Sequence, residues 1–328
     1  MIINTTRPKL STLYSLLLSR YRHTLAPMIE AEPAPAFEAK SPLVRNALQQ
    51  VGDVFDRLGA YSYLTAMDRS DFGYYRALYE EALRAIDRRI ERGTLIPADL
   101  RDFPDLVRFK HYAIDAALFI GSFDPFQMTH LAMALRYLSS DLACAPVVFV
   151  IPEGHSNSYK PHKSDYAYRR DLVKLQLEGV FNPFIVPLDL GQGADTIEIV
   201  RRFIALFPGS TLRLSHILGS DVLPFAAALL PEDLVAWNGQ AALSGVDFSY
   251  RAFVIKRADT PDPRPIIELV RSMGLAVDLD ERSIATPSST DFRENRAFSI
   301  VFPTESIVRH MEILFRLNLN KPWRPSGP

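Results

Sequence analysis

ALFIGSFDPFQMTHLAMAL, residues 117–135, is the stretch that decides the fold. A short apolar run stops at Gly121, a tight loop follows, and a helical apolar pattern begins at Leu131. This order predicts a buried strand, a loop and the start of a helix. In an open parallel sheet, ligands bind outside the carboxyl end of such a strand, and a helix N-terminus suits a phosphate. The stretch therefore predicts an anion-binding loop.

Downstream, strands and helices alternate. Apolar, β-branched runs predict a strand at 116–120 and five more at 147–151, 184–188, 212–218, 252–256 and 275–279. Helical spacing is found between most of them, notably at 168–178 and 195–207, and again at 305–317. This alternation predicts an α/β domain with a Rossmann-like, doubly wound parallel sheet over residues 115–328.

Upstream, residues 1–114 are expected to form an all-helical domain. Ser41-Pro42 favours a helix start, and Gly59 favours the end of that helix. A further helix runs from Tyr74, and its charged residues, Asp87 and Arg89 among them, are expected on a solvated face rather than at a nucleic-acid site. The first 26 residues fit an amphipathic helix, although they resemble a transit peptide. A cap on the active site and an oligomer surface are the two roles expected for this domain.

Composition bounds the function. The chain has 328 residues, so two domains are expected. Its formal net charge is -1, so no bulk electrostatic attraction to nucleic acid or to a membrane is expected. No run is apolar enough to cross a bilayer. The single cysteine, Cys144, excludes an internal disulfide and is expected to be a buried small residue. A cytoplasmic location fits these features.

The residues GSFDPFQMTH, 121–130, resemble the GxFDPxHxGH signature of the nucleotidyltransferase superfamily, most closely that of nicotinate/nicotinamide mononucleotide adenylyltransferases. The resemblance implies transfer of AMP from ATP to nicotinate or nicotinamide mononucleotide with release of pyrophosphate, and with Mg²⁺ as cofactor. Two positions depart from the signature. Gln127 replaces a histidine and can donate hydrogen bonds but carries no charge. Thr129 replaces a glycine, and its side chain is expected to occupy space beside the nucleotide.

Three later segments resemble further elements of the same family. Pro161-His162-Lys163 resembles a PHK-like loop that precedes an arginine-bearing helix, Gly219-Ser220-Asp221 resembles a GxD element, and residues 287–293, PSSTDFR, resemble a triphosphate-binding ISSTxIR element. The implied catalytic residues are His130, Lys163 and Arg293. The implied nucleotide-binding residues are Gly121, Ser122, Phe123, Gln127, Gly219, Asp221, Ser288, Ser289 and Thr290. The implied acceptor-binding residues are Asp124, Arg170, Thr196 and Trp237, and no protein metal site is expected.

Plainer interpretations stay open for several of these residues. Asp221 and residues 288–290 also suit helix N-caps, and Lys163 suits an ordinary surface loop. His216, inside an apolar strand, is expected to be a core histidine, and the GQG at 191–193 is weak as a dinucleotide fingerprint. Two alternative functions also stay open: an adenylyl- or cytidylyltransferase for another phosphorylated acceptor, and a catalytically weak nucleotide-binding regulatory protein.

Overall fold

A parallel sheet positions every element discussed below. The computed structural model describes residues 39–59, 66–97, 113–154, 163–177, 181, 184–258 and 260–284. In these residues six strands pair in the order β3-β2-β1-β4-β5-β6, all parallel. The strands are β1 Ala113–Gly121, β2 Val148–Pro152, β3 Ile185–Pro187, β4 Thr211–Gly219, β5 Asp247–Arg257 and β6 Ala276–Ile284.

The expected α/β class is therefore confirmed, and each expected strand is present. The ends differ most at the start of β5 and at the end of β6. The strand order reverses direction between β1 and β4, and ligands in open α/β sheets bind in the crevice at this switch point.

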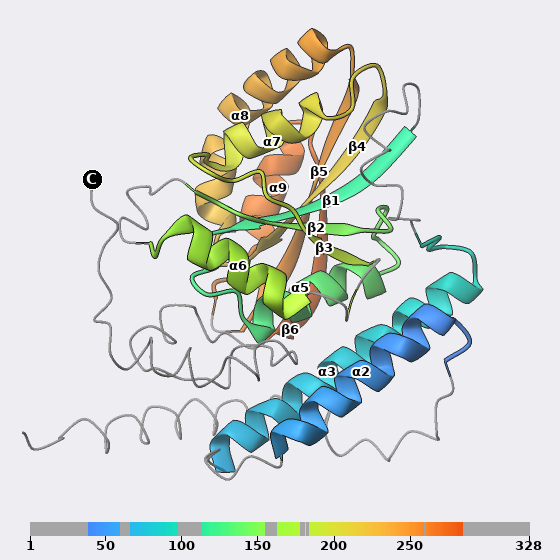
Figure 1. The fold of residues 1–328 in the computed structure, drawn as a ribbon. Coiled ribbons are helices and arrows are strands. Elements are labelled where there is room, and N and C mark those ends of the chain that lie inside the picture. The colour runs from blue at the N-terminus through green and yellow to red at the C-terminus, as the bar shows by residue number, and fades with distance from the viewer. Residues whose placement is uncertain are drawn as a thin grey trace, which may run out of the picture. The chain divides into compact units, whose positions relative to one another are not determined.

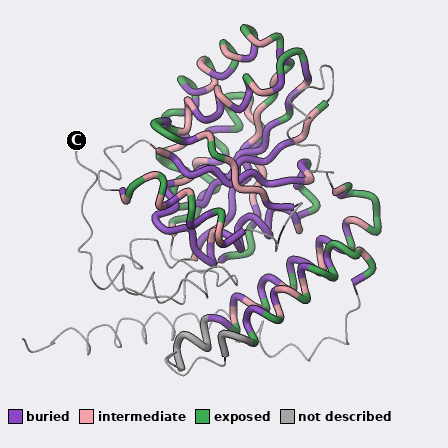
Figure 2. The backbone as a smooth tube through the Cα atoms, in the orientation of Figure 1, coloured by how far each residue is buried: buried purple, intermediate pink, exposed green. Residues whose placement is uncertain are grey.

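Helices cover both faces of the sheet (Figure 1). On one side lie α5 Met128–Ser139, which contacts β4 and β6, and α6 Tyr166–Leu177, which contacts β2 and β3. On the other side lie α7 Thr196–Ala205, α8 Leu223–Ser244 and α9 Arg264–Ser272. Figure 2 shows buried backbone through the centre of the sheet. Strand β2 and most of β4 are buried, whereas β6 is exposed or half-buried over most of its length. Burial on both faces explains why β2 and the second half of β1 are continuous apolar runs.

Helix α8 was not predicted individually. Its sequence is apolar around the whole circumference, with Pro231 inside it, so no single apolar stripe marks it as a helix. Pro224 lies in its first turn, where a missing N–H costs nothing, and Gly245 ends it in a left-handed conformation. The expected helix at 305–317 and the first 38 residues lie outside the described residues.

Two helices upstream of the sheet form a hairpin. Helix α2 spans Pro42–Gly59, as Ser41-Pro42 and Gly59 predict, and α3 spans Ala66–Glu91, which starts earlier than Tyr74. Helix α3 also packs against α5. The expected division between 114 and 115 stays a prediction.

Two charged residues of α3 correct the expectation of a solvated face. Asp87 is 1% exposed and accepts hydrogen bonds from the backbone N–H groups of Lys40 and Ser41. Arg89 is 3% exposed and donates to the carbonyl oxygens of Leu138 and Ala143. Both are buried because α3 has neighbours on two sides, and buried charges are stable only with such partners.

Cys144 is a second correction, because it is exposed. The apolar strand begins only at Val148, so Cys144 lies in the connection that follows α5. Its Sγ lies 3.4 Å from Nη1 of Arg251.

Candidate functional site

A cavity of about 600 Å³ lies at the carboxyl ends of β1 and β4 and continues beneath α8. Its volume is within the usual range for small-molecule sites. It gathers most of the predicted site residues that the structure describes: Gly121, Ser122, Phe123, Asp124, Gln127, His130, Lys163, Thr196, Gly219, Asp221 and Trp237. Ser288, Ser289, Thr290 and Arg293 lie outside the described residues. Residues that the sequence analysis singled out in several distant segments therefore line one cavity.

The loop between β1 and α5 is held by aromatic packing. Phe123 has a φ of 42°, a left-handed conformation that is rare for a bulky residue and is typical of functional loops. Its ring centroid lies 5.2 Å from those of Phe119 and Phe126, and 5.0 Å from that of His130. These contacts fix the ring of His130 at the start of α5.

One hydrogen bond defines the protonation of His130. Its Nδ1 lies 3.1 Å from the backbone nitrogen of Gln127, the N-cap of α5. Because a backbone N–H can only donate, Nδ1 accepts, and the proton of the neutral ring is on Nε2. His130 lines the cavity, so a neutral imidazole with an Nε2–H donor stands at the helix N-terminus.

Thr129 corrects the expectation that its side chain crowds the nucleotide. The residue is fully buried, and its Oγ1 lies 2.6 Å from the hydroxyl of Tyr75 in α3. One turn along α3, the Tyr79 hydroxyl donates to the carbonyl oxygen of Met128 at 2.8 Å. The threonine therefore serves the contact between α3 and α5.

We expect Tyr75→Phe to lower the free energy of unfolding by about 1 kcal/mol, because one buried hydrogen bond is lost. Urea unfolding of the single variants and of the Tyr75→Phe/Thr129→Val double variant measures the coupling between the two hydroxyls. Strictly additive effects would contradict a direct Tyr75–Thr129 bond.

Lys163 is buried rather than placed on an ordinary surface loop. Its Nζ lies 2.7 Å from Oε2 of Glu153, and both side chains are nearly inaccessible. Glu153 Oε1 in turn accepts from the Thr196 hydroxyl at 3.3 Å. Glu153, which sequence reasoning missed, thereby joins the end of β2 to Lys163 and to the start of α7. Its position directly after a parallel strand was the available signal.

The arginine of α6 that contacts the segments around the cavity is Arg169, which the sequence analysis did not single out, rather than Arg170. Arg169 is 1% exposed and donates to the carbonyl oxygens of Ser122, Glu153 and Ser164, at 2.6, 2.7 and 2.9 Å. Burial lowers the pKa of its guanidinium, and the negative charge of Asp124 opposes that shift. Arg169 therefore ties together three segments around the cavity.

Arg170 is not among the residues that line the cavity. It pairs with Asp171 and Asp189 on the outer side of α6. Asp124, by contrast, is 3% exposed and accepts from the backbone N–H of Ser164 at 2.8 Å, so it holds the segment next to Lys163.

Asp221 pairs with a cation that the sequence did not reveal. Its Oδ2 lies 3.0 Å from Nη1 of Arg257, which ends β5 and also lines the cavity. The N-cap of α8 is Val222, so Asp221 does not cap that helix. A Cβ on Gly219 would lie 2.3 Å from the Asp221 carboxylate, so a side chain at this position would displace that carboxylate. Arg257 follows a predicted strand, which was its only sequence signal.

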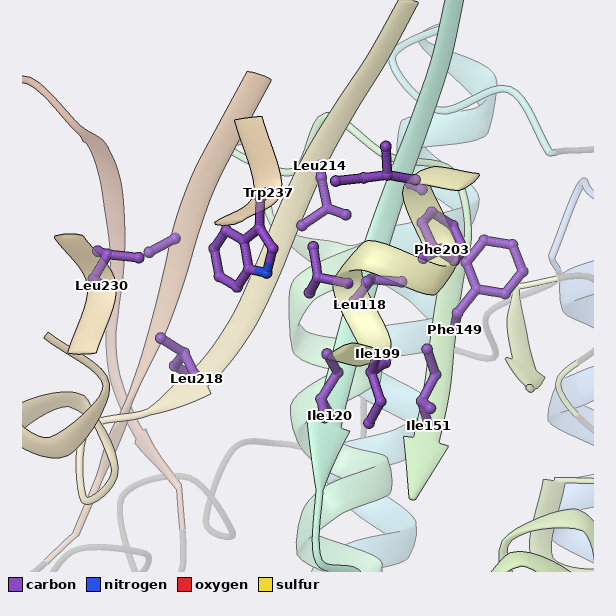
Figure 3. Close-up of a cluster of buried hydrophobic side chains, with 14 of the residues drawn as sticks. Leu118, Ile120, Phe149, Ile151, Ile199, Phe203, Leu214, Leu218, Leu230 and Trp237 are labelled. Atoms are coloured by element: carbon purple, nitrogen blue, oxygen red, sulfur yellow. The ribbon is translucent and has the colours of Figure 1, made fainter. Parts of the chain in front are cut away.

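The end of the cavity beneath α8 is aromatic. Trp237 is 1% exposed, packs against the tilted ring of Tyr250 with centroids 5.1 Å apart, and donates from Nε1 to the carbonyl oxygen of Ile197. Figure 3 shows Trp237 in the apolar cluster with Leu214, Leu218 and Leu230. His216 is a core histidine, as predicted: it contacts the Tyr250 hydroxyl, and burial lowers its pKa to about 4.

The GQG segment has a packing role. A Cβ on Gly191 would lie 1.7 Å from the carbonyl oxygen of Pro152, and one on Gly154 would lie 2.0 Å from that of Gly191. The chain after β3 therefore passes directly against the end of β2, and only glycine permits that approach.

Over the described ranges, no group of three or more His, Cys, Asp or Glu side chains forms a metal cage. The same ranges contain no helix that is both long and apolar enough to span a membrane.

No known protein family and no curated protein matches the chain. Among solved structures, it is similar to Plasmodium falciparum nicotinic acid mononucleotide adenylyltransferase, complexed with APC and with NaAD. The identities are 17% and 16%, over 62% and 63% of this chain and 99% and 98% of those chains, each with a TM-score of 0.40. Thermotoga maritima TmcAL bound with alpha-thio ATP is 11% identical over 61% of this chain and 56% of its own, with a TM-score of 0.29. Identities and scores at this level assign no function, so the residues of the site have to support one.

Proposed function

We propose that the chain is a nucleotidyltransferase that transfers AMP from ATP to nicotinate or nicotinamide mononucleotide and releases pyrophosphate. One observation carries this proposal. The N-terminus of α5, His130 and Lys163 line a single cavity at the switch point of a doubly wound sheet. This arrangement suits the phosphates of a nucleotide, because the helix start offers N–H groups and a partial positive charge.

Catalysis of nucleotidyl transfer depends mainly on positioning the two reactants and on neutralising the charge of the phosphates. A phosphate oxygen of the acceptor attacks the α-phosphorus of ATP, the bond to the bridging oxygen breaks, and pyrophosphate leaves with the electron pair. The His130 Nε2–H would donate to a phosphate oxygen as charge develops. Arg169 keeps the loop at Ser122 and the end of β2 at a fixed separation, so that the reactants can be aligned.

We propose that Mg²⁺ binds together with the triphosphate of ATP. This ion usually keeps several waters and needs only one or two protein carboxylates beside the phosphates. Asp221 fits that role, because its side chain is 39% exposed at the cavity. The ion would neutralise phosphate charge.

A second candidate is a nucleotide-binding protein with weak catalysis. It is favoured by the shortage of unpaired positive charge among the described residues of the cavity, because such charge would stabilise the phosphates in the transition state. The described part of the lining holds five carboxyl groups and two long basic side chains. Both cations, Lys163 and Arg257, are already ion-paired.

Pyrophosphate release separates the candidates. Purified protein is incubated with Mg²⁺, each nucleoside triphosphate and a panel of phosphorylated acceptors. We expect release with ATP and a nicotinate-type mononucleotide. Release only with another acceptor or nucleotide would replace our substrate with an adenylyl- or cytidylyltransferase alternative. Nucleotide binding without release of pyrophosphate would support the second candidate, a nucleotide-binding protein, and exclude the nucleotidyltransferase.

Gln127→His is expected to raise turnover by about tenfold, because an imidazole, unlike a neutral amide, can take up a proton and carry a positive charge beside a bound phosphate. Gln127 is 1% exposed at the N-cap of α5, so the change acts next to His130. Initial rates at saturating substrate measure the effect, and Gln127→Ala is the comparison, with a lower rate than the wild type. A lower rate for Gln127→His would show that glutamine is tuned to a different substrate.

A further inference from the structure

A buried carboxyl oxygen that has no hydrogen-bond partner among the described residues lies in the part of the cavity beneath α8. Asp233 is 7% exposed, and within the described part of the chain its Oδ1 is buried with no hydrogen-bond partner. Asp233 also lines the cavity. Buried polar atoms in proteins are almost always paired, so such an atom requires an explanation, and a bound ligand is one.

The neighbouring donors are already engaged elsewhere. Trp237, one turn along α8, donates its only N–H to the carbonyl oxygen of Ile197. The Thr196 hydroxyl donates to Glu153 at 3.3 Å, and the Tyr250 hydroxyl shares a 3.2 Å hydrogen bond with Nδ1 of His216 in which either group can be the donor. Asp233 Oδ1 is paired with none of these groups. Asp233 is therefore left to accept a hydrogen bond from whatever enters this end of the cavity.

The charge of this end is negative. Burial, together with the charges of Asp195 at the start of α7 and Glu232 on α8, raises the pKa of Asp233 to about 6. Of the other groups here, Tyr250 has its pKa raised by burial and His216 has its pKa lowered to about 4, so both are neutral at pH 8. At pH 8 the site combines an aromatic wall with an ionised carboxylate.

We propose that Asp233 determines which acceptor is used: the cavity beneath α8 takes a flat heteroaromatic group bearing an N–H donor in preference to the same group bearing a carboxylate. The aromatic surfaces of Trp237 and Tyr250 suit a planar ring. The carboxylate of Asp233 accepts from an amide or amine and repels a second carboxylate. This inference rests on the proposed function and specifies its acceptor.

The test uses two probes that differ only at this group, nicotinamide mononucleotide and nicotinic acid mononucleotide. Their affinities for the full chain are measured by calorimetry at pH 8. We expect the wild type to bind the amide at least about tenfold more tightly, since a site built around one polar group rejects a ligand that cannot pair with it. Asp233→Asn is expected to reduce this ratio to about threefold or less. Glu232→Gln, which removes an exposed charge from the adjacent position of α8, is expected to keep it.

Equal affinities in the wild type, preference for the carboxylate, or binding of neither mononucleotide would overturn the inference. An unchanged ratio in Asp233→Asn would do the same. Thermal unfolding at pH 8 is a second readout, because loss of an unpaired buried charge should leave the melting temperature of Asp233→Asn equal or higher. A clear decrease would instead reveal a structural role and count against the inference.

Pyrophosphate release, recorded on the same samples, tests the proposed function separately. Release without the expected selectivity overturns the role of Asp233 and keeps the nucleotidyltransferase. Selective binding without release from any triphosphate overturns catalysis while the role of Asp233 in ligand recognition stands.

Discussion

Replacing His130 with alanine is expected to lower the rate of pyrophosphate release by about 10- to 100-fold, the loss of one hydrogen bond to a charged phosphate. The imidazole is neutral, with its proton on Nε2, because Nδ1 accepts from the backbone N–H of Gln127. Under the proposed function, we therefore expect it to contribute a single donor to the transition state.

His130→Gln is the matched comparison, because a glutamine amide can present a donor at a similar distance. We expect it to recover part of the lost rate. Single-turnover measurements at saturating ATP and acceptor separate this loss from weaker binding. Melting temperatures establish that both variants are folded. An unchanged rate in His130→Ala would show that the cavity at β1 and β4 is not where phosphates react.

Arg169→Met is expected to lower the free energy of unfolding by about 3–5 kcal/mol and the melting temperature by about 10 °C. The substitution leaves three carbonyl oxygens, those of Ser122, Glu153 and Ser164, without the buried guanidinium that they now share. Buried acceptors without donors carry the full cost of their lost hydration. Differential scanning calorimetry measures the change.

Arg170→Met provides a control of identical chemistry at the next position. Arg170 makes exposed pairs with Asp171 and Asp189, and such pairs contribute about 0–1 kcal/mol. We expect the melting temperature to change by less than about 3 °C. Similar losses in the two variants would contradict the role assigned to Arg169, and a selective loss of acceptor binding in Arg170→Met would return the acceptor site to Arg170.

The sequence predicted the sheet because each strand contains a short apolar or β-branched run. It could also predict that residues from distant segments would line one cavity, because the loops that follow parallel strands meet at one edge of the sheet. The sequence could not show which of Arg169 and Arg170 faces the segments around the cavity. Adjacent helix positions point about 100° apart, and the apolar pattern of α6 is too weak to fix its orientation. The role of such a side chain depends on residues that other segments bring next to it. Thr129 is an example, because its side chain contacts Tyr75 of α3.

The same limit applies to Cys144, Asp87 and Arg89. Whether a small or charged residue is buried depends on what packs against it, and the packing of α3 on α5 involves residues about 50 positions apart. Asp233 was missed for a related reason, because α8 lacks the periodicity that would have shown which of its residues face the sheet.

Helix α3 contacts both ends of α5: Tyr75 and Tyr79 reach its first turn, and Arg89 reaches the carbonyl oxygen of Leu138 in its last. A small rotation or shift of α3 would thus be transmitted to the imidazole of His130. An insertion or deletion in the hairpin would then move His130 even in a relative whose sequence keeps every cavity residue. Comparisons that count only cavity residues would then mistake an inactive relative for an active one.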